Sequence, residues 1–546
     1  MTSLVALALA PSVALAVGGD GISLARATAI ASALPRVRSL ERTHPHSFSQ
    51  VSSPVLGQWQ VAFYSKDQEF VQVLVDRSDG HVIATYTGIQ IAWTMARGTP
   101  GAFGRHVTSL YVWLPLCLLF LAPFFDWRSP LRWRNLDLLA LTSLSISLGF
   151  FNHADINLSV PLAYPPLVYL LARLAWRARP RAARPPPLRL NFPPRLLLVG
   201  LVVLIAFRIT LNVVDSNVID VGFANVVGAQ KVTDSQPLYG QFPGTIARGD
   251  TYGPVSYEAY VPFVAAFGFN GTWDSVPAAH AAAIAFDLLT ILLLFLLGWR
   301  IRGPSTGIVL AYAWAAFPFT AYALESNSND ALVAALVTAS LLVASSPPAR
   351  GFLSALAGLT KYAPLALAPV LATYRLGERR LRGIVAFAVA FAAAAALALI
   401  PALDHNTLAT IFSRSVTYQA DRVAPFSLWG LYGGMHSAQV AVQALAVAFA
   451  LGLALQRREE PLQLAAALAA ILIAIELGVT YWFYLYIPWF FAPAAVAFLG
   501  GARFEPGRRA ASEPRRWRVV WDSRRGGWLL DRPKSLLSGG RARAAR

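Results

Sequence analysis

The chain has 546 residues, of which 56% are hydrophobic and 14% are charged, and its mean hydropathy is +0.51. This composition excludes a set of soluble domains, which would need more charged surface, and indicates a polytopic membrane protein. The net charge is +18, but the basic residues gather in a C-terminal tail and in short loops between apolar runs. That distribution follows the positive-inside rule, so it predicts topology and no nucleic-acid partner. A single cysteine, Cys117, excludes an intramolecular disulfide.

The N-terminal part differs from the rest of the chain. Residues 1–17 form a short apolar run that ends in small residues, which predicts a signal peptide or, as an alternative, an N-terminal anchor. Residues 18–105 combine a helical stretch with GQWQVAFYSKDQEFVQVLVDRSDGHVIATYTG, in which apolar and polar residues alternate between polar turns. We therefore expect a small extracytoplasmic α+β domain.

Apolar segments of near-spanning length follow, separated by short polar loops. A helix needs about 20 apolar residues to cross the hydrocarbon core. If the basic loops face the cytoplasm, the N-terminal domain and the loops 214–276 and 402–435 lie outside, and the basic tail 502–546 is cytoplasmic and disordered. The sequence thus predicts three accessory spans with a basic loop over 106–194 and a main membrane domain over 195–501. The eleven expected spans lie near 108–125, 137–151, 158–175, 196–213, 277–299, 305–323, 330–345, 382–401, 436–455, 462–480 and 482–500.

One apolar segment does not fit a simple span. GFLSALAGLTKYAPLALAPVLATYR (351–375) has arginines near both ends and a Lys-Tyr-Ala-Pro interruption in the middle. We interpret it as a re-entrant pair of short helices with Lys361 and Pro364 near the turn, because irregular backbone at membrane depth needs protein or a water-filled cavity around it. The alternative is one continuous helix with a proline kink.

Acidic and cationic residues are few on the predicted outer side. In VVDSNVIDVG, Asp215 and Asp220 follow directly on an apolar helix, and the long aromatic loop after them is of the kind that is usually functional. The turn ESNSND contains Asn329 and Asp330, although Asp330 could simply cap the next helix. The aromatic run VTYWFYLYIPWFF (479–491) predicts an interfacial belt rather than ligand contact.

The order of these parts resembles the GT-C class of polytopic glycosyltransferases, and within it glycosyltransferase family 87. The resemblance spans roughly residues 195–500 and is carried by the Asp220…PLYG loop, by SNSND and by GLTKYAPL. The N-terminal domain weakly resembles a PepSY-like module through its turn around Asp76, which implies an accessory role. The GT-C resemblance implies transfer of a sugar, most simply a mannose-like hexose, from a polyprenyl-phosphate carrier to a glycolipid, polysaccharide or protein on the outer face. By its position before the Pro-x-Tyr element, Asp220 matches the family's catalytic base best, and Asp215 is the second candidate.

The residue chemistry is compatible with that activity. A sugar phosphate already has a good leaving group, so one carboxylate suffices as base and cations are needed for the departing phosphate. Direct attack by the acceptor predicts inversion at the anomeric carbon. No metal-ligand spacing is apparent, so we expect no metal and no other cofactor. The candidate substrate-binding residues are Lys361, Arg414, Arg422, Tyr239, Tyr252, Tyr257, Glu258, Asn329 and Asp330.

Two other functions fit parts of the sequence. In a transporter or flippase for an envelope precursor, Arg208, Asp287 and Lys361 would line a path, but such folds usually contain internal repeats, and none is apparent here. A non-catalytic sensor or assembly protein would leave the acidic loop and the interrupted segment unexplained. The sequence therefore favours the transferase.

Overall fold

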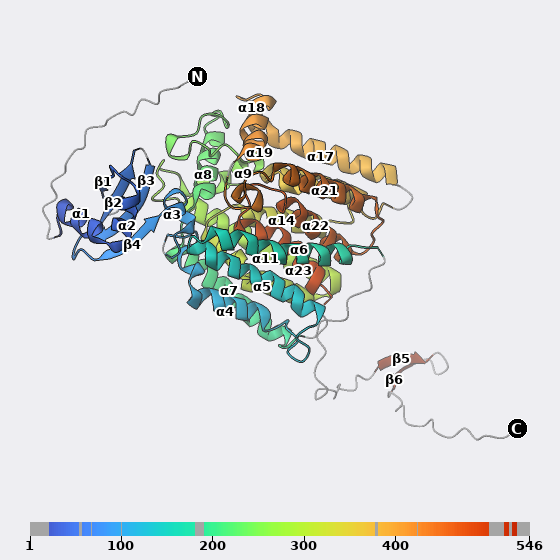
Figure 1. Ribbon diagram of the computed structural model, residues 1–546. Coiled ribbons are helices and arrows are strands. Elements are labelled where there is room, and N and C mark those ends of the chain that lie inside the picture. The colour runs from blue at the N-terminus through green and yellow to red at the C-terminus, as the bar shows by residue number, and fades with distance from the viewer. Residues whose placement is uncertain are drawn as a thin grey trace.

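The computed structural model describes residues 21–53, 57–66, 68–99, 101–180, 190–376, 380–422 and 424–501, and the backbone of 518–522 and 527–531. The predicted signal peptide or anchor over 1–17 lies outside the described residues. A small domain with one β-sheet joins a large helical bundle (Figure 1). The protein is thus mostly helical with a small N-terminal sheet domain, as the sequence predicts.

The N-terminal domain is a four-stranded antiparallel sheet with two helices on it. The strands β1 (Phe48–Ser52), β2 (Gln58–Ser65), β3 (Gln68–Asp76) and β4 (Val82–Thr87) pair in chain order. The alternating runs predicted as strands form β2 to β4, and β1 adds an edge strand. Helices α1 (Leu24–Ala33) and α2 (Pro35–Thr43) pack on the sheet. The core between them consists of small and β-branched side chains from the helices (Ala27, Ala31, Val37) and from the sheet (Val61, Val71, Val73).

Short elements lead from this domain into the bundle. They are α3 (Ile89–Ala92), η1 (Thr94–Ala96) and η2 (Arg105–Thr108). The bundle begins with α4 (Leu110–Leu121), α5 (Trp133–Asn152), α6 (Ile156–Arg177) and α7 (Pro194–Asp215). The loop after α7 folds into α8 (Asp220–Thr233), η3 (Gly244–Ile246), α9 (Pro254–Glu258) and α10 (Val261–Phe267).

The second half of the bundle carries the interrupted segment. Its elements are α11 (Pro277–Arg302), α12 (Pro304–Ala316), α13 (Pro318–Glu325), α14 (Asp330–Leu342), α15 (Pro347–Thr360), η4 (Ala363–Leu367), α16 (Ala368–Thr373) and α17 (Arg380–Leu403). The loop after α17 holds α18 (Leu408–Phe412), the π-helix η6 (Ser413–Thr417), α19 (Tyr418–Asp421) and α20 (Leu428–Leu431). The chain continues with α21 (His436–Leu455), α22 (Pro461–Glu476), η7 (Tyr484–Tyr486) and α23 (Ile487–Leu499).

By length and composition, five described helices could cross a membrane, or six if the pair α12 and α13, bent by 60°, is one span. The five are α6, α7, α11, α17 and α21. Most of the other predicted spans appear as shorter apolar helices of 10–17 residues. In the bent pair, Pro318 begins α13 and separates it from α12. The membrane character of the bundle is confirmed, whereas the predicted count of eleven spans is not.

The interruption predicted around Lys361 is present. Helix α15 ends at Thr360, and Lys361 has an extended backbone before the chain enters η4. Pro364 lies in the first turn of η4, where its missing N–H leaves no helical hydrogen bond broken. One continuous kinked helix is therefore excluded, and Lys361 sits at a true break.

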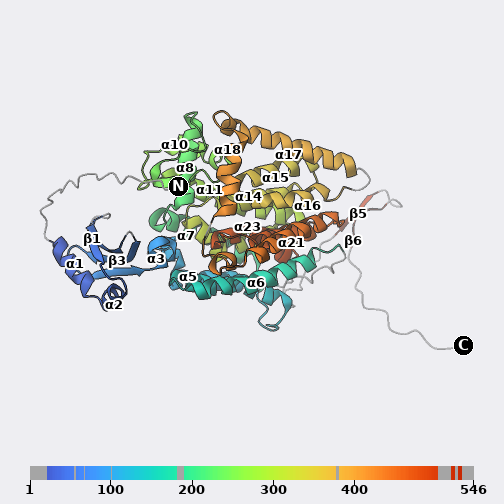
Figure 2. The same ribbon diagram turned by 45° about the horizontal axis from the view of Figure 1, so that its top comes forward.

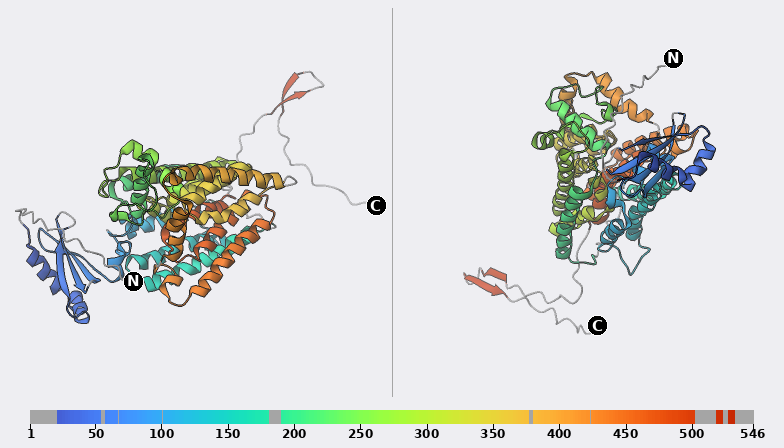
Figure 3. Two further views of the ribbon diagram at one scale, coloured as in Figure 1. Left: turned by 90° about the horizontal axis from the view of Figure 1, so that it is seen from above. Right: turned by 90° about the vertical axis from the view of Figure 1, so that its left-hand side faces the viewer.

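The polar loops gather at one end of the bundle. Figures 2 and 3 show the N-terminal domain beside the end that carries α8 and α10, and α18 reaches the same end after α17. The opposite end carries the termination of α11 at Arg302 and the start of α17 at Arg380. This arrangement agrees with the charge pattern of the sequence, in which the basic loops share one side.

Two short strands are described within the tail. The strands β5 (Arg518–Asp522) and β6 (Gly527–Asp531) pair antiparallel with Trp521 opposite Trp528. In the sequence each of these segments contains β-branched or aromatic residues, a composition that favours strands. The rest of the tail lies outside the described residues.

Candidate functional site

A cavity of about 250 Å³ opens at the end of the bundle that carries the polar loops. Its wall is built by segments far apart in the chain: the start of α8, the loop before α9, the start of α14, the break after α15, the segment around α19 and the segment from α22 to α23. The ionisable residues in this wall are Asp220, Asp330, Lys361, Arg422, Glu476 and the tyrosines 252, 362, 481 and 486.

Asp220 is the first residue of α8 and faces the cavity. Backbone hydrogen bonds from Asn217 N to Glu325 O (3.2 Å) and from Ile219 N to Ser326 O (3.3 Å) fix the approach of its segment. Gly222 lets the start of α8 approach the backbone of Asn327 closely, because a Cβ at this position would lie 2.4 Å from Asn327 O. The carboxylate thus stands at a helix N-terminus, where the helix dipole favours negative charge.

Protein surrounds Asp220 on most sides, although its carboxylate reaches the cavity. This burial raises the pKa of the Asp220 carboxyl, and the positive charges of Arg422 and Lys361 oppose the rise. A carboxylate with a raised pKa is a better proton acceptor than an ordinary aspartate, so the environment suits a general base.

Lys361 and Asp330 form an ion pair in the cavity wall. Lys361 Nζ lies 2.5 Å from Asp330 Oδ1, and Trp489 Nε1 donates to the same oxygen at 2.8 Å. The ammonium also lies 5.8, 5.5 and 5.1 Å from the ring centroids of Tyr252, Tyr486 and Trp489. Asp330 Oδ2 is buried without a hydrogen-bond partner. Asp330 therefore compensates the lysine rather than only beginning helix α14.

Arg422 is the second cation of the cavity. Its guanidinium stacks on the ring of Tyr481, with Cζ 3.6 Å from the ring centroid. Among the described residues, no carboxylate lies within ion-pair distance of it. A guanidinium held flat against an aromatic ring keeps donors available for an anion.

The aromatic segment after α22 corrects one prediction. Tyr481, Phe483, Tyr486 and Trp489 line the cavity, and Phe483 and Trp489 are almost completely buried, so the segment is not a lipid-facing belt. Composition alone does not separate the two roles, because both need aromatic rings. The signal in the sequence was the presence of two outer cations, Lys361 and Arg422, which require aromatic or anionic neighbours when they are desolvated.

The sequence also missed Glu476, which ends α22 and lines the cavity. Its Oε2 accepts a hydrogen bond from Trp482 Nε1 at 3.1 Å, and its Oε1 is buried without a partner. An acid at the end of an apolar helix was available as a signal, because burying a carboxyl in such a position is costly without a role.

Asp215 lies outside this cavity. Its Oδ2 is 2.6 Å from His106 Nδ1, and Asn217 Oδ1 accepts a hydrogen bond of 2.7 Å from Gly104 N. Phe103, next in the same connecting segment, does line the cavity and packs edge-on against Phe483. The structure therefore gives Asp215 a role in holding the segment that leaves the N-terminal domain.

Of the remaining candidates, Tyr252 alone lines the cavity. Tyr239 and Tyr257 are buried, and their hydroxyls donate to Tyr252 O at 2.9 Å and Gly249 O at 2.7 Å. Neither ring is placed to stack on a sugar in this cavity or to meet lipid. Both tyrosines hold the loop that presents Tyr252.

Three further candidates also lie in the supporting structure. Arg414 Nε is 3.4 Å from Asp250 Oδ2, and Asn329 donates to Ser256 Oγ. Glu258 follows in the same loop, with its Oε1 buried and unpartnered. Burial raises the pKa of the Glu258 carboxyl to about 7.

Arg208 and Asp287 do not line a path across the bundle. Arg208 Nη2 lies 2.5 Å from Asp287 Oδ1, the same oxygen accepts from Trp314 Nε1 at 2.8 Å, and both charged side chains are at most 4% exposed. A buried, fully paired arginine and aspartate are typical of a structural ion pair. The charges of Arg208 and Asp287, which had suggested a transport path, therefore have a structural explanation that does not need transport.

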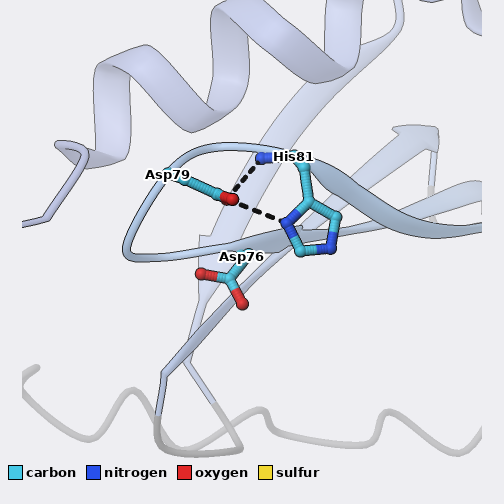
Figure 4. Close-up of side chains that lie close together, drawn as sticks. All are labelled: Asp76, Asp79 and His81. Atoms are coloured by element: carbon cyan, nitrogen blue, oxygen red, sulfur yellow. Dashed lines mark hydrogen bonds and ion pairs between the residues drawn. The ribbon is translucent and has the colours of Figure 1, made fainter.

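A separate group in the N-terminal domain has metal-like geometry. Ligand atoms of Asp76, Asp79 and His81, on the turn between β3 and β4, lie within 4.8 Å of one another (Figure 4). Asp79 Oδ1 accepts from His81 N at 2.9 Å and lies 2.8 Å from His81 Nδ1. The turn's own hydrogen bonds account for the arrangement.

Comparison with known proteins supports the resemblance inferred from the sequence. Residues 251–480 match the model of glycosyltransferase family 87. This range includes Tyr252, Asp330, Lys361, Arg422 and Glu476, whereas Asp220 precedes it. The match confirms the predicted resemblance to GT-C-type membrane glycosyltransferases.

A solved structure, that of ArnT from Cupriavidus metallidurans bound to undecaprenyl phosphate, is similar at 16% identity with a TM-score of 0.38. The similarity covers 56% of this chain and 59% of ArnT, so the chain spans less than two thirds of that relative. No curated protein sequence matches the chain.

Proposed function

We propose that the protein transfers a sugar from a polyprenyl-phosphate carrier to a hydroxyl group of a cell-envelope acceptor at the outer membrane face, with inversion. The observation that carries the proposal is the cavity in which the half-buried carboxylate of Asp220 shares the wall with the cations Arg422 and Lys361 and with seven aromatic side chains. The family match over most of this wall supports the same reaction class.

The chemistry needs one base and one site for the leaving group. The acceptor oxygen attacks the anomeric carbon while its proton passes to the Asp220 carboxylate. The bond between the anomeric carbon and the phosphate oxygen breaks, and the electron pair leaves with the polyprenyl phosphate. Arg422 stabilises the negative charge that develops on this phosphate, because it lines the same cavity and has no carboxylate partner among the described residues. A single displacement of this kind inverts the anomeric centre.

The aromatic wall fits a hexose, and mannose is the simplest candidate. Tyr252 and Trp489 offer ring faces beside the ion pair of Lys361, which is a common way to hold the apolar face of a sugar. The acceptor is a glycolipid, a polysaccharide or a protein. The basic loops and the tail lie on the cytoplasmic side in this arrangement, and the N-terminal domain and the cavity lie outside.

The test is sugar transfer by purified protein in detergent. The donor is polyprenyl-phosphate mannose, repeated with other lipid-linked hexoses, and the acceptor is a cell-envelope lipid extract. Asp220→Asn should lower the rate by a factor of about 10² to 10⁴, the usual contribution of a general base. Asp215→Asn is the matched control, because it removes a nearby carboxylate that does not line the cavity, and it should retain most of the activity.

Two results would contradict the proposal. Loss of transfer with Asp215→Asn but not with Asp220→Asn would show that Asp215, and not Asp220, is the base. Absence of transfer by the unmodified protein with every lipid-linked donor would show that the protein does not catalyse this reaction.

A further inference from the structure

A second cavity, of about 360 Å³, lies at the end of the bundle opposite Asp220. It is formed where α11 and α14 end, where the chain leaves α16 and where α22 begins. Three arginines stand in its wall, Arg300, Arg302 and Arg375, against a single acid, Glu460, among the described lining residues. The wall therefore has an excess of positive charge.

Two of the three arginines are held by neutral groups. Arg300 donates to Leu342 O at 2.8 Å and to Ser345 Oγ at 3.1 Å, and Arg302 donates to Gly501 O at 3.2 Å. In the part of the chain that the structure describes, none of the three lies within ion-pair distance of a carboxylate. Among the described residues, their charge is thus oriented without a directly paired carboxylate.

A fourth arginine, Arg350, lies behind the same wall and is 1% exposed. Its Nη1 donates to Ala344 O, and its Cζ lies 5.6 Å from the ring centroid of Tyr374; both partners line the cavity. Its Nε and Nη2 are buried without a hydrogen-bond partner. Leaving charged donors buried and unpaired is costly, so the site is incomplete without an acceptor.

Two other buried arginines show how the guanidinium nitrogens are satisfied when every one of them has a hydrogen-bond partner. Arg208 pairs with Asp287 and also donates to Ala315 O and Thr320 Oγ1. Arg458 donates to Ala178 O, Leu453 O and the side-chain oxygen of Gln456. In both, all three guanidinium nitrogens have partners. Arg350 therefore differs from these two arginines, because two of its three guanidinium nitrogens lack an acceptor that an anion would supply.

We propose that this basic cavity binds a phosphate group, supplied by an anionic phospholipid headgroup or by free phosphate. Arginine is suited to phosphate because its planar donors can engage two oxygens at once. Apolar side chains stand beside the arginines in the wall, Leu297, Leu341 and Leu462 among them, and these suit the glycerol and upper acyl carbons of a lipid. Basic pockets between membrane helices on the cytoplasmic side are a known way of holding anionic headgroups.

The test is binding of phosphatidylglycerol to the purified full-length protein, followed by native mass spectrometry, with phosphatidylcholine as the neutral reference. The wild type should retain phosphatidylglycerol selectively. The rim variant R300Q/R375Q should bind it at least about tenfold more weakly, because hydrogen bonds to charged groups are lost. R179Q removes an exposed arginine at the same end that stacks on Trp176, and it should bind as the wild type does.

Inorganic phosphate distinguishes the two sources. If millimolar phosphate binds and phosphatidylglycerol does not, the ligand is free phosphate; if the lipid binds and phosphate only competes weakly, it is the headgroup. R350M tests the buried donors and should reduce whichever binding is seen. Equal binding of both probes to wild type, R300Q/R375Q and R350M would overturn the proposal. Sugar transfer measured on the same samples reports separately on the cavity of Asp220.

Discussion

Lys361 Nζ lies 2.5 Å from Asp330 Oδ1, where the break after α15 meets the start of α14. The two groups come from segments that the sequence analysis treated as separate sources of substrate contacts. Their pairing means that the lysine charge is largely balanced within the wall of the cavity. Of the two cations in this cavity, Arg422 has no carboxylate partner among the described residues, which makes it the main candidate for binding the donor phosphate.

Lys361→Met should destabilise the protein strongly. It would leave Asp330, which is 0% exposed and has a second oxygen without a partner, as an uncompensated buried carboxylate. Breaking one side of such a pair costs about 3–5 kcal/mol. The double variant Lys361→Met with Asp330→Asn should recover most of this loss, as measured by thermal unfolding in detergent. A double variant no more stable than the single one would show that the pair does not carry the effect.

Arg422→Gln should raise the KM for the lipid-linked donor by at least about tenfold, because a hydrogen-bonded charge opposite the phosphate is lost. Arg248→Gln is the matched control: Arg248 also lies over a tyrosine ring, that of Tyr418, at 5.2 Å, but it does not line the cavity. Steady-state kinetics with varied donor checks the difference. Equal KM values for the two variants would remove Arg422 from phosphate binding.

The pH dependence of transfer should report on Asp220. A base must be deprotonated, so activity is lost as pH falls through the pKa of Asp220 in the folded protein. Because burial raises that pKa, the loss should occur above the ordinary carboxyl range near pH 4. Arg422→Gln removes a charge that lowers this pKa, and the acidic limb should move to higher pH. If Arg422→Gln leaves the acidic limb of the pH profile unchanged, then the charge of Arg422 does not influence the pKa of Asp220.

Gly253→Ala should lower activity through the position of Tyr252. A Cβ at Gly253 would lie 1.9 Å from Leu359 O, so the loop would have to move away from the end of α15. Gly244→Ala in the same loop meets no atom within 4 Å and has no positive φ, which makes it the control. We expect transfer to fall at least several-fold for Gly253→Ala and to stay near wild type for Gly244→Ala.

Glu258 should make stability depend on pH near neutrality. Its pKa is raised to about 7 in the folded protein, so folding favours the protonated form. The favourable contribution is complete below the unfolded carboxyl pKa and is lost as pH rises through about 7. Glu258→Gln should therefore stabilise the protein at pH 8, by roughly 1–2 kcal/mol after allowance for partial exposure, and change little at pH 4. Equal effects at both pH values would contradict this.

Patterns within short stretches of the sequence predicted the features that depend on neighbouring residues alone, namely strands and a helix break. The alternation in residues 57–88 predicted three of the four strands of the N-terminal sheet, β2 to β4, and the Lys-Tyr-Ala-Pro interruption predicted the break at Lys361. The resemblance identified the glycosyltransferase class, which the family match supports.

The contacts inside the site could not be predicted in the same way, because they join residues far apart in the chain. Asp330 lies opposite Lys361, and Arg422 lies on Tyr481, only after the bundle has folded. The aromatic run over 479–491 was misjudged for the same reason: its composition fits a lipid boundary and a cavity wall equally well. Burial, which decides between them, is a property of the packed bundle.

The contacts of Asp215 have a mechanical consequence. The segment that leaves the N-terminal domain is tied to the chain just ahead of Asp220 at two points, His106 to Asp215 and Gly104 to Asn217. Phe103 of that segment is itself part of the cavity wall. A movement of the N-terminal domain would therefore pull on the residues just before α8, which position the Asp220 carboxylate.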